Sequence, residues 1–512
     1  MSGPEKRSRR GRAARRAASV EKPGLRRLPY IQNKIPFTEL LSQEGLELIE
    51  HNADTILEEI GMEFRGDAEA LELWRAAGAD VQGERVRVPR GMARKLCATV
   101  PEEFTMHARD PRRNIQIGGR NMVFAPIGGA PFVEDLDNGR RYGSIEDFEN
   151  LVKLSHASPA IHHSGFHHCE PTDVAINKRH LDMTYALLRY SDRPFMGIGT
   201  HPVRATECIE MAKMVFGRDF LRNHVVMNTI INVNSPLVLD DTMLGSLKVY
   251  TRNNQASIIT PALLAGAMGP VTAAGCLAQL LAEVMGGIAF TQLLNPGCPM
   301  VFGSFLGAAS MQSGAPVFGT PESLHMLYGA GQLARRLGIP LRTGGALCSS
   351  KVPDFQAAQE STAMMYATVH AGANIVHQGA GWLDGGLTAS FEKFVMDADQ
   401  LVMLQKYCEG IDLSDNGQAL AAIREVGPGS HFLGCQHTQD NFRTVFCESK
   451  VWDTNSYEQW VDDGSQTAAQ RANAIWKQTL KDYEPPAMDV ALDEALKEYV
   501  AAKKASRPDA IG

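Results

Sequence analysis

The chain has 512 residues, 44% of them apolar, so it can bury a large core. This length favours one large barrel with additions, or two to three domains. Nine cysteines are scattered without CxxC pairs or metal-knuckle spacing, which is typical of reduced thiols and excludes a disulfide-stapled secreted domain. We therefore expect a cytoplasmic protein.

The first part of the chain differs in charge from the rest. Residues 1–27 contain ten Lys or Arg and two Glu, a charge of +8, whereas the whole chain carries −7 and the remainder therefore −15. The segment has no apolar stretch of a secretory signal, so we interpret residues 1–30 as a disordered basic tail. It could bind nucleic acid, but the acidic body would oppose DNA. An inert tail and no nucleic-acid partner are the favoured interpretation.

Residues 31–119 are expected to form an N-terminal helical region. Apolar residues recur at helical spacing between Phe37 and about Gly78, and again over residues 91–104. The alternating "VQGERVRVP" predicts a short strand between these helices, and residues 105–126 resemble a hairpin.

In residues 120–400, short apolar or β-branched runs alternate with helical segments. The runs lie at 122–126, 160–167, 194–199, 225–233, 256–260, 299–305, 340–343 and 373–377. Eight strand-plus-helix units are what a (β/α)8 TIM barrel requires, whereas an open doubly wound sheet needs fewer. The predicted fold class is therefore α/β, a barrel followed by a C-terminal helical region over residues 401–512.

One segment resembles a membrane span. Between Arg252 and Glu322 the only charged residue is Glu283, and residues 273–294 are long enough to cross a bilayer. Glu283 and two glutamines lie within this segment, and Pro-Gly breaks flank it. We interpret it as a helix buried inside a large soluble fold, without a membrane partner.

The histidine-rich "IHHSGFHHCE" raises the alternative of a metal site. On a strand, His162 and His168 face one way while His163 and His167 face the other, so only two or three could converge on a metal. A metal-dependent barrel hydrolase remains an alternative, but we expect no directly bound metal. The chain also lacks GxSxG, a P-loop and a strand-associated GxGxxG, which argues against a nucleotide cofactor.

In the predicted barrel, the loops after the eight runs gather on one face, where barrel enzymes do their chemistry. Aromatic residues, carboxylates and hydrogen-bonding side chains occur in these loops. Aromatic faces and carboxylates suit a cation that cannot donate hydrogen bonds, with about 0.5 to 2 kcal/mol per good cation–π contact. The alternative for any single aromatic residue is that it packs the barrel rim.

Over residues 35–500 the chain resembles the trimethylamine methyltransferase family. The resemblance rests on an ordered series of motifs that includes "ADTILEEIGMEF", "GGAPFVEDLDNGRRYGSIEDF", "SSKVPDFQAAQE" and "GAGWLDGGLTASFEKFVMDAD". It implies a (β/α)8 barrel that passes a methyl group from an amine to the cobalt of a corrinoid, a cobalamin carried by a separate small protein. Barrels of this family commonly self-associate, so we expect a homo-oligomer.

The resemblance also bears on the substrate. Trimethylamine enzymes of the family place pyrrolysine at the barrel mouth, whereas this sequence contains only standard residues. If that position falls in or near residues 349–356, an ordinary side chain replaces it, and a quaternary amine such as glycine betaine becomes the expected methyl donor. Trimethylamine or another methylamine, a metal-dependent hydrolase, and a non-catalytic betaine-binding protein are the alternatives.

Position then suggests roles for individual residues. Asp354, Glu360 and His377 are the catalytic candidates, with the two carboxylates supplying field for the cation. Phe355 or Trp382 would form an aromatic wall, and Arg342 or His201 would pair with a substrate carboxylate. The full set of substrate-binding candidates is His201, Phe305, Arg342, Phe355, Gln356, Gln378, Trp382 and Asp384.

Overall fold

The computed structural model describes residues 28–165 and 167–510. Residues 1–27 of the predicted basic tail lie outside this range. The described chain divides into two compact units. The larger contains residues 28–409 and 449–510, and the smaller contains residues 410–448.

A run of parallel strands forms the centre of the larger unit. The strands pair in the order β10, β11, β13, β14, β17, β18 and β7, and every neighbouring pair in this run is parallel. Their bounds are β7 Asn121–Phe124, β10 Phe195–Met196, β11 Met227–Val233, β13 Ala256–Ala265, β14 Met300–Gly303, β17 Leu341–Arg342 and β18 Ile375–Val376. Each lies within or overlaps one of the runs predicted from the sequence. The strands are apolar and almost wholly buried, as is typical of parallel sheets covered by helices.

The remaining predicted run, residues 160–167, forms no named strand. Its backbone nevertheless bonds to both neighbours: the His162 and His163 N–H groups donate to Phe124 O at 2.9 and 3.2 Å, and Met196 N donates to Gly165 O at 3.0 Å. Because two successive residues donate to one carbonyl, the regular ladder of a strand is interrupted here. Among the described residues, the named strands therefore form a mixed α/β fold without a closed sheet.

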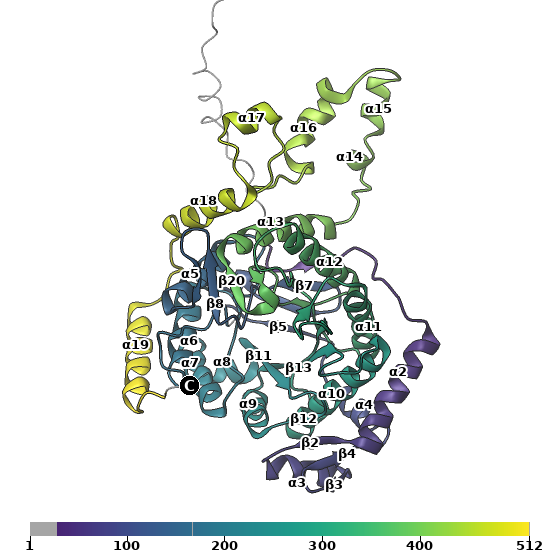
Figure 1. Cartoon of the computed structure of the whole chain (residues 1–512), viewed down its shortest axis with the longest axis vertical. Coiled ribbons are helices and arrows are strands. Elements are labelled where there is room, and N and C mark those ends of the chain that lie inside the picture. The colour runs from purple at the N-terminus through teal and green to yellow at the C-terminus, as the bar shows by residue number, and fades with distance from the viewer. Residues whose placement is uncertain (1–27, 166, 511–512) are drawn as a thin grey trace, which may run out of the picture. The chain divides into compact units, whose positions relative to one another are not determined.

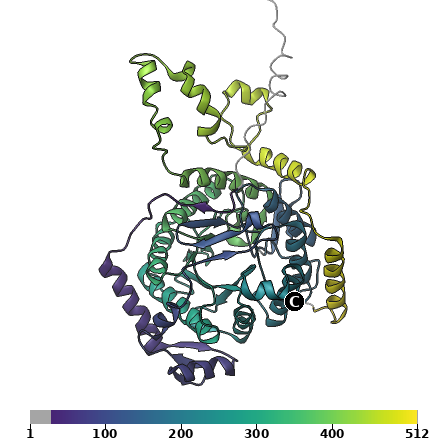
Figure 2. The same ribbon diagram turned by 180° about the vertical axis from the view of Figure 1, so that it is seen from behind.

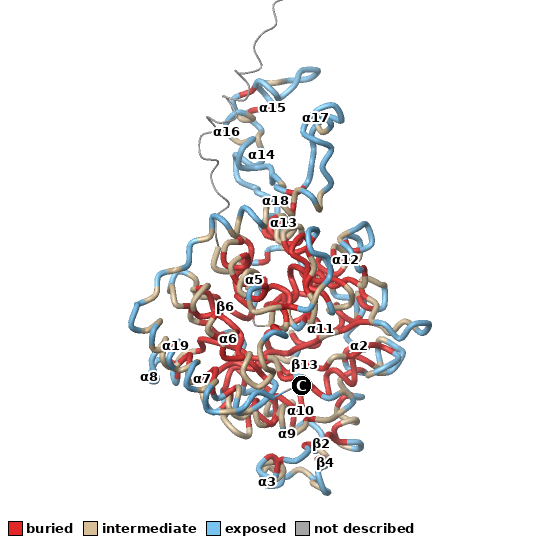
Figure 3. Tube along the Cα trace, turned by 60° about the vertical axis from the view of Figure 1, so that its left-hand side comes forward, coloured by how far each residue is buried: buried red, intermediate tan, exposed pale blue. Residues whose placement is uncertain are grey.

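Helices surround the strands in a ring (Figure 1), and the view from behind shows the same arrangement (Figure 2). They are α5 Ile145–Ala157, α6 Arg179–Tyr190, α7 Pro202–Phe216, α8 Arg218–Asn223, α9 Asp241–Arg252, α10 Ala273–Leu294, α11 Pro321–Leu337, α12 Phe355–Ala371 and α13 Phe391–Cys408. Local sequence determines several of their starts: Ser144 and Asp147 form a capping box at α5, and the Asp354 side chain caps α12. Burial is concentrated along the strands and the inner helix faces (Figure 3).

Helix α10 explains the membrane-like segment. Among the described residues it is the one helix long and apolar enough to cross a membrane, and 83% of its apolar window is buried. It packs against β13 and also against the N-terminal helices α2 Gln43–Thr55 and α4 Met92–Cys97. Protein therefore covers it on several sides, so it needs no polar face. The prediction of a buried helix is confirmed.

The N-terminal region contains more strand than we expected. Besides α2 and α4 it has the π-helical turn η1 Ile56–Ile60, α3 Ala68–Ala77, and the strands β2 Met62–Phe64, β3 Asp80–Gln82 and β4 Arg85–Arg87. These strands form a small sheet with β12 Val238–Leu239. Next, β5 Glu103–Met106 and β6 Ile115–Gly118 form an antiparallel hairpin, separated by η2 Pro111–Arg113, and β6 pairs with β7. The strand β1 Ile31–Gln32 also pairs with β7.

Two small sheets extend the loops that follow the parallel strands. One consists of β8 Phe132–Asp135, β9 Gly139–Tyr142, β19 Trp382–Leu383 and β20 Thr388–Ser390, with η3 Asp384–Gly386 between the last two. In the other, β15 Phe305–Ala309 pairs with the end of β13 and with β16 Pro316–Val317. These additions hold residues of the candidate site described below.

The C-terminal part is helical, as expected. In the larger unit, α17 Tyr457–Asp462 is followed by α18 Ala468–Lys481, which packs on α13 and α5, and by α19 Val490–Ala505, which packs on α6 and α7. The smaller unit contains α14 Asp415–Gln418, α15 Leu420–Val426, η4 Phe432–Gly434 and α16 Gln436–Val445. Within residues 410–448 only Ala422 and Cys435 are buried, so this unit has very little core of its own.

Candidate functional site

Two predicted site residues on neighbouring parallel strands are in direct contact. Arg342 ends β17, His377 directly follows β18, and Arg342 Nη2 lies 3.0 Å from His377 Nδ1. Arg342 Nη1 also donates to Ser304 O at 2.9 Å. Both side chains are buried, at 2% and 3% exposure. The strand order thus brings together residues that are 35 positions apart in the sequence.

The charge on Arg342 has no acidic partner among the described residues. Burial lowers its pKa to about 10, so the guanidinium stays protonated at neutral pH. Its Nε is buried and makes no hydrogen bond. Burying an unpaired cation is costly unless hydrogen bonds or an anion compensate for it. The Nε–H donor of Arg342 is therefore buried without a hydrogen-bond acceptor.

The histidine cluster of the sequence lies around this pair, and two of its histidines accept backbone N–H groups. His162 Nδ1 accepts from Phe124 N at 3.0 Å, and His163 Nδ1 accepts from Gly165 N at 2.9 Å. His167 Nε2 pairs instead with Glu170 Oε1 at 2.6 Å. Among residues 28–165 and 167–510, no group of three His, Cys, Asp or Glu side chains is arranged to hold a metal ion. The cluster therefore lends no support to a metal-dependent hydrolase.

These buried imidazoles are neutral. Burial lowers the pKa of His163 to about 4 and that of His168 to about 3. The pKa of His377 lies well below its ordinary value because of burial first, and then because of the charge of Arg342. At neutral pH, Arg342 supplies the positive charge of the group and the histidines supply uncharged hydrogen-bonding atoms.

Three aromatic rings form a cluster near this charge. Phe305 lies 5.6 Å from Phe318 and 5.9 Å from Trp382, and Phe318 lies 6.1 Å from Trp382, centroid to centroid. Trp382 Nε1 donates to Cys348 O at 3.1 Å, which fixes the indole. Phe318 and Trp382 are buried and Phe305 is partly exposed. Of the two residues predicted to form an aromatic wall, Trp382 lies in this cluster beside the binding candidate Phe305, whereas Phe355 is 83% exposed. Their binding roles stay predictions.

The loop before α12 is held by two of the predicted carboxylates. Glu360 accepts the backbone N–H of Ser349 at 2.5 Å through Oε2, and Gln356 Nε2 donates to Glu360 Oε1 at 2.8 Å. Asp354 accepts from Ala357 N at 3.0 Å and from Ser350 Oγ at 2.8 Å. These bonds lower the pKa of Asp354, which is exposed. In this geometry both carboxylates position the loop.

The other candidates are placed as follows. Gln378 is buried, and its Oε1 accepts the N–H of Gly128 at 2.6 Å. Asp384 lies 3.3 Å from Arg140 and 3.7 Å from Lys351, so nearby cations neutralise it. His201 is exposed and caps α7 by accepting from Val203 N at 3.2 Å. Binding roles for these residues stay predictions.

Several residues that the sequence did not single out complete the site. Phe318 closes the aromatic cluster, Ser304 O anchors Arg342, and Cys348 O holds Trp382. Nothing in the sequence marks Phe318, since it precedes an ordinary Gly-Thr-Pro turn. Burial raises the pKa of the Cys348 thiol to about 11, so this cysteine is no thiolate nucleophile at neutral pH.

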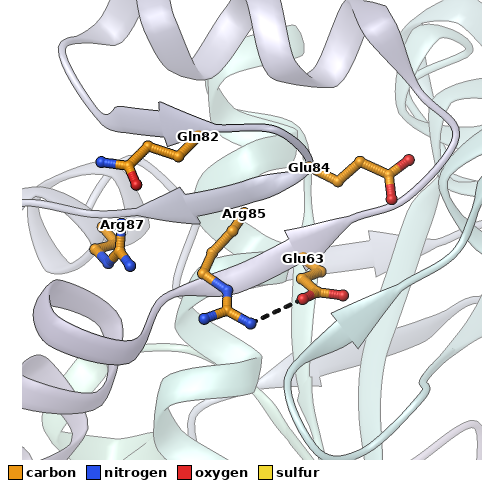
Figure 4. Close-up of a pocket in the computed structure, with 5 residues that line it drawn as sticks. All are labelled: Glu63, Gln82, Glu84, Arg85 and Arg87. Carbon is orange, nitrogen blue, oxygen red and sulfur yellow. Dashed lines mark hydrogen bonds and ion pairs between the residues drawn. The ribbon is translucent and has the colours of Figure 1, made fainter.

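A shallow pocket of about 340 Å³ lies elsewhere, on the small N-terminal sheet (Figure 4). It is lined by Glu63, Gln82, Glu84, Arg85 and Arg87. Arg85 pairs with Glu63 at 3.0 Å, and Arg87 pairs with Asp80 at 3.4 Å. Because these exposed charges are already paired with one another, we interpret the pocket as a surface depression without a ligand.

Comparison with known proteins gives a consistent result. The model of the family "Trimethylamine methyltransferase (MTTB)" matches residues 7–508. The chain is 39% identical over 470 residues to glycine betaine methyltransferase from Desulfitobacterium hafniense strain Y51, covering 92% of this chain and 98% of that protein.

Two further relatives are more distant. Trimethylamine methyltransferase MttB from Desulfitobacterium hafniense strain DSM 10664 / DCB-2 is 26% identical over 473 residues, covering 90% of this chain and 92% of the relative. L-carnitine:corrinoid methyltransferase from Eubacterium limosum is 24% identical over 474 residues, covering 88% and 94%.

Proposed function

The chain belongs to the trimethylamine methyltransferase (MTTB) family, and from this premise we propose that it transfers a methyl group from glycine betaine, or a similar quaternary amine, to the Co(I) of a corrinoid carried by a separate protein. The observation that carries the proposal is the 39% identity to glycine betaine methyltransferase across 98% of that protein. The trimethylamine relative is 26% identical. This difference favours a quaternary over a tertiary amine.

The chemistry of the site agrees with a quaternary methyl donor. Such a donor leaves as a neutral tertiary amine, so the reaction needs no general base. The carboxylates of the loop before α12 are engaged by backbone and side-chain donors, and burial keeps the pKa of His377 well below its ordinary value, which makes this imidazole a weak base. A protonated tertiary amine would first have to lose a proton, and we find no group poised for that step among the described residues of the site.

Reduced cobalt supplies the electron pair that accepts the methyl group, and this chain supplies the environment. The positive charge on nitrogen is cancelled as the methyl group leaves, so a dry pocket favours the transition state. Phe305, Phe318 and Trp382 present ring faces and edges where such a cation would be desolvated. One good cation–π contact contributes about 0.5 to 2 kcal/mol.

We propose a (β/α)8 barrel over residues 120–400, to which residues 31–119 and 401–512 are added. Seven parallel strands and the backbone bonds from residues 162–165 to β7 and to β10 support it. The site residues follow the carboxyl ends of these strands, where barrel enzymes place their chemistry. The corrinoid carrier would dock over the same ends, because cobalt must reach the methyl carbon. The name of the relative L-carnitine:corrinoid methyltransferase likewise includes a corrinoid.

We also propose that the protein is cytoplasmic and self-associates. Nine free cysteines support the first point. For the second, residues 410–448 expose nine large apolar side chains, which are Ile411, Leu413, Leu420, Ile423, Phe432, Leu433, Phe442, Val445 and Phe446. Each is at least 45% exposed, and a large exposed apolar surface is typical of an interaction site. A permanent contact between copies suits such an apolar surface better than a carrier that must leave after each turnover.

The test is to mix the protein with Co(I) cobalamin, or a cognate corrinoid protein, and to follow methylcobalamin absorbance. The donors are glycine betaine, proline betaine, carnitine, choline and trimethylamine. We expect turnover with glycine betaine and little with trimethylamine. Absence of turnover with every quaternary amine would refute the proposed function. Binding without transfer would favour a non-catalytic betaine-binding protein.

A further inference from the structure

We propose that Arg342 and His377 form a buried subsite for a carboxylate, which holds the acid end of a short zwitterionic amine and so makes the enzyme selective for betaines over choline-like cations. This inference rests on the proposed function for the identity of the amine. The subsite itself rests on the hydrogen-bonding geometry of the two residues.

The first step concerns the guanidinium. Arginine carries five N–H donors and no acceptor. Arg342 directs donors to Ser304 O and to His377 Nδ1, while its buried Nε has no partner. Among the described residues it pairs with no carboxylate. A buried guanidinium without a carboxylate partner is suited to bind an anionic ligand.

Another buried arginine shows what a purely structural guanidinium looks like in this protein. Arg193 donates to the carbonyl oxygens of Ser155, His156, Ser158 and Ile161. It is thus surrounded by acceptors supplied by the chain. Arg342 has one carbonyl and one imidazole nitrogen. The chain thus supplies fewer hydrogen-bond acceptors to Arg342 than to Arg193, and we assign the missing acceptor to a ligand.

The second step assigns the proton on His377. Its Nδ1 faces the Arg342 guanidinium, which can only donate, so Nδ1 must be the acceptor. The neutral ring then carries its hydrogen on Nε2. His377 Nε2 is buried and makes no hydrogen bond. It is therefore an unused N–H donor beside the unused Nε–H of Arg342.

The third step asks whether one ligand group can reach both donors. Since Arg342 and His377 are joined at 3.0 Å, their free N–H groups lie at most about 7.5 Å apart, so both donors belong to one small site. The single positive charge of Arg342 matches a monoanion. A neutral or cationic group at this point would leave the donors unpaired.

The Gly128–Gly129 turn covers the His377 imidazole. Gly128 is partly exposed and Gly129 is exposed. A methyl group built on Gly128 would lie 3.3 Å from both Cε1 and Nε2 of His377. Gly128 therefore packs closely against the free edge of the imidazole. Gln378 fixes this turn through its bond to Gly128 N.

The backbone also links the subsite to the aromatic cluster. Arg342 is anchored on Ser304 O, and the next residue, Phe305, carries the ring that contacts Phe318 and Trp382. A ligand with its carboxylate on Arg342 would thus need only a short connection to bring a trimethylammonium group toward Phe305.

The experiment is calorimetric binding without any corrinoid. The probes are glycine betaine, choline, and 3,3-dimethylbutyrate, in which carbon replaces the charged nitrogen. For the wild type we expect choline to bind at least tenfold more weakly than glycine betaine, and 3,3-dimethylbutyrate to bind measurably. Equal affinity for choline and glycine betaine, or no binding of either carboxylate, would overturn the subsite.

Two substitutions of one residue supply a matched pair. His377→Asn places its amide near the Nδ1 position and loses the outer donor, whereas His377→Gln can place an N–H near Nε2. We expect His377→Asn to weaken glycine betaine binding at least tenfold and to leave choline binding unchanged, while His377→Gln retains most of the betaine affinity. Wild-type affinity in His377→Asn, or an equal loss for choline, contradicts the assignment. Arg342→Gln, if it folds, should lose betaine binding more severely than either.

These results separate the subsite from the proposed function. If the binding pattern holds but no methyl transfer occurs, the function fails and the subsite stands. If methyl transfer proceeds equally well from choline and glycine betaine, the subsite fails and the function stands.

Discussion

Lys393 Nζ lies 2.5 Å from Asp397 Oδ1, one turn further along α13, and both side chains are buried. Asp397 Oδ2 also accepts the N–H of Gly381 at 2.9 Å, and Lys393 donates to Ser361 Oγ on α12 at 2.9 Å. The ion pair therefore fixes the backbone immediately before Trp382 and ties it to two helices. The ion pair therefore helps to hold Trp382, and with it the aromatic cluster, in place.

Breaking this pair should destabilise the protein. Asp397→Leu leaves a buried Lys393 without a counter-ion and Lys393→Met leaves a buried Asp397 without one, so we expect each single variant to lose about 3 to 5 kcal/mol in the free energy of unfolding. The double variant Lys393→Met with Asp397→Leu removes both charges and should lose less than the two single variants combined. Denaturant unfolding of all four proteins measures this. Additive losses would show that the pair is not coupled.

Trp382 should matter for its ring more than for its N–H. We expect Trp382→Ala to lower methyl transfer at least tenfold, about 1.4 kcal/mol in the barrier, because the cation loses an aromatic face. Trp382→Phe keeps an aromatic face and loses only the bond to Cys348 O, so most turnover should remain. Methylcobalamin formation provides the measurement. Equal rates in the alanine variant and the wild type would remove Trp382 from the site.

Asp354 offers a test between capping and electrostatics. Asp354→Ala removes the N-cap of α12 and should cost about 1 kcal/mol of stability together with a tenfold loss of turnover. Asparagine caps a helix about as well as aspartate. We therefore expect Asp354→Asn to keep both stability and turnover, because the exposed carboxylate is screened by water. A tenfold loss in the asparagine variant would instead establish that the negative charge acts on the substrate.

The strand positions could be predicted because short apolar runs between amphipathic segments are a local signal. Residues 160–167 gave the same signal but form no strand, since His162 and His163 share one acceptor on β7. That detail depends on packing and is invisible in the sequence. The hairpin of β8 and β9 was missed although Asp137-Asn138-Gly139 is a recognisable turn.

For the site, residue types in the sequence identified candidates, but the sequence did not indicate which of these side chains are exposed. Arg342, His377, Phe305 and Trp382 were named from the sequence, and the structure places them in two adjoining groups. Phe355 belongs to the same loop motif as Asp354, yet it points into solvent because it occupies the first turn of α12. The Phe318 ring reaches the cluster through the β15–β16 extension, a tertiary contact that no local pattern encodes.

Glu170 predicts a pH dependence of stability. Burial alone would raise its pKa, but the hydrogen bond and charge of His167 and those of Arg179 outweigh burial and lower the pKa to about 2. A depressed carboxyl pKa stabilises the fold above the ordinary value and loses this contribution as the pH falls toward the folded value. Glu170→Gln should therefore be about 2 kcal/mol less stable at neutral pH, and the difference should shrink between about pH 4.5 and pH 2. Thermal unfolding of both proteins across this range is the measurement, and a constant difference would contradict it.

Self-association through residues 410–448 can be tested at Leu433, which is 82% exposed. A glutamate there places a charge within the apolar surface, and burying an unpaired carboxylate in an interface is unfavourable. We expect Leu433→Glu to shift the protein to a smaller species by light scattering and to leave its helix content by circular dichroism unchanged, because the residue contributes little to the core. Gln439→Glu adds the same side chain at an exposed polar position of this unit and should leave the assembly unchanged. If the wild type is a monomer at micromolar concentration, or if both variants assemble like the wild type, residues 410–448 do not form the contact between copies.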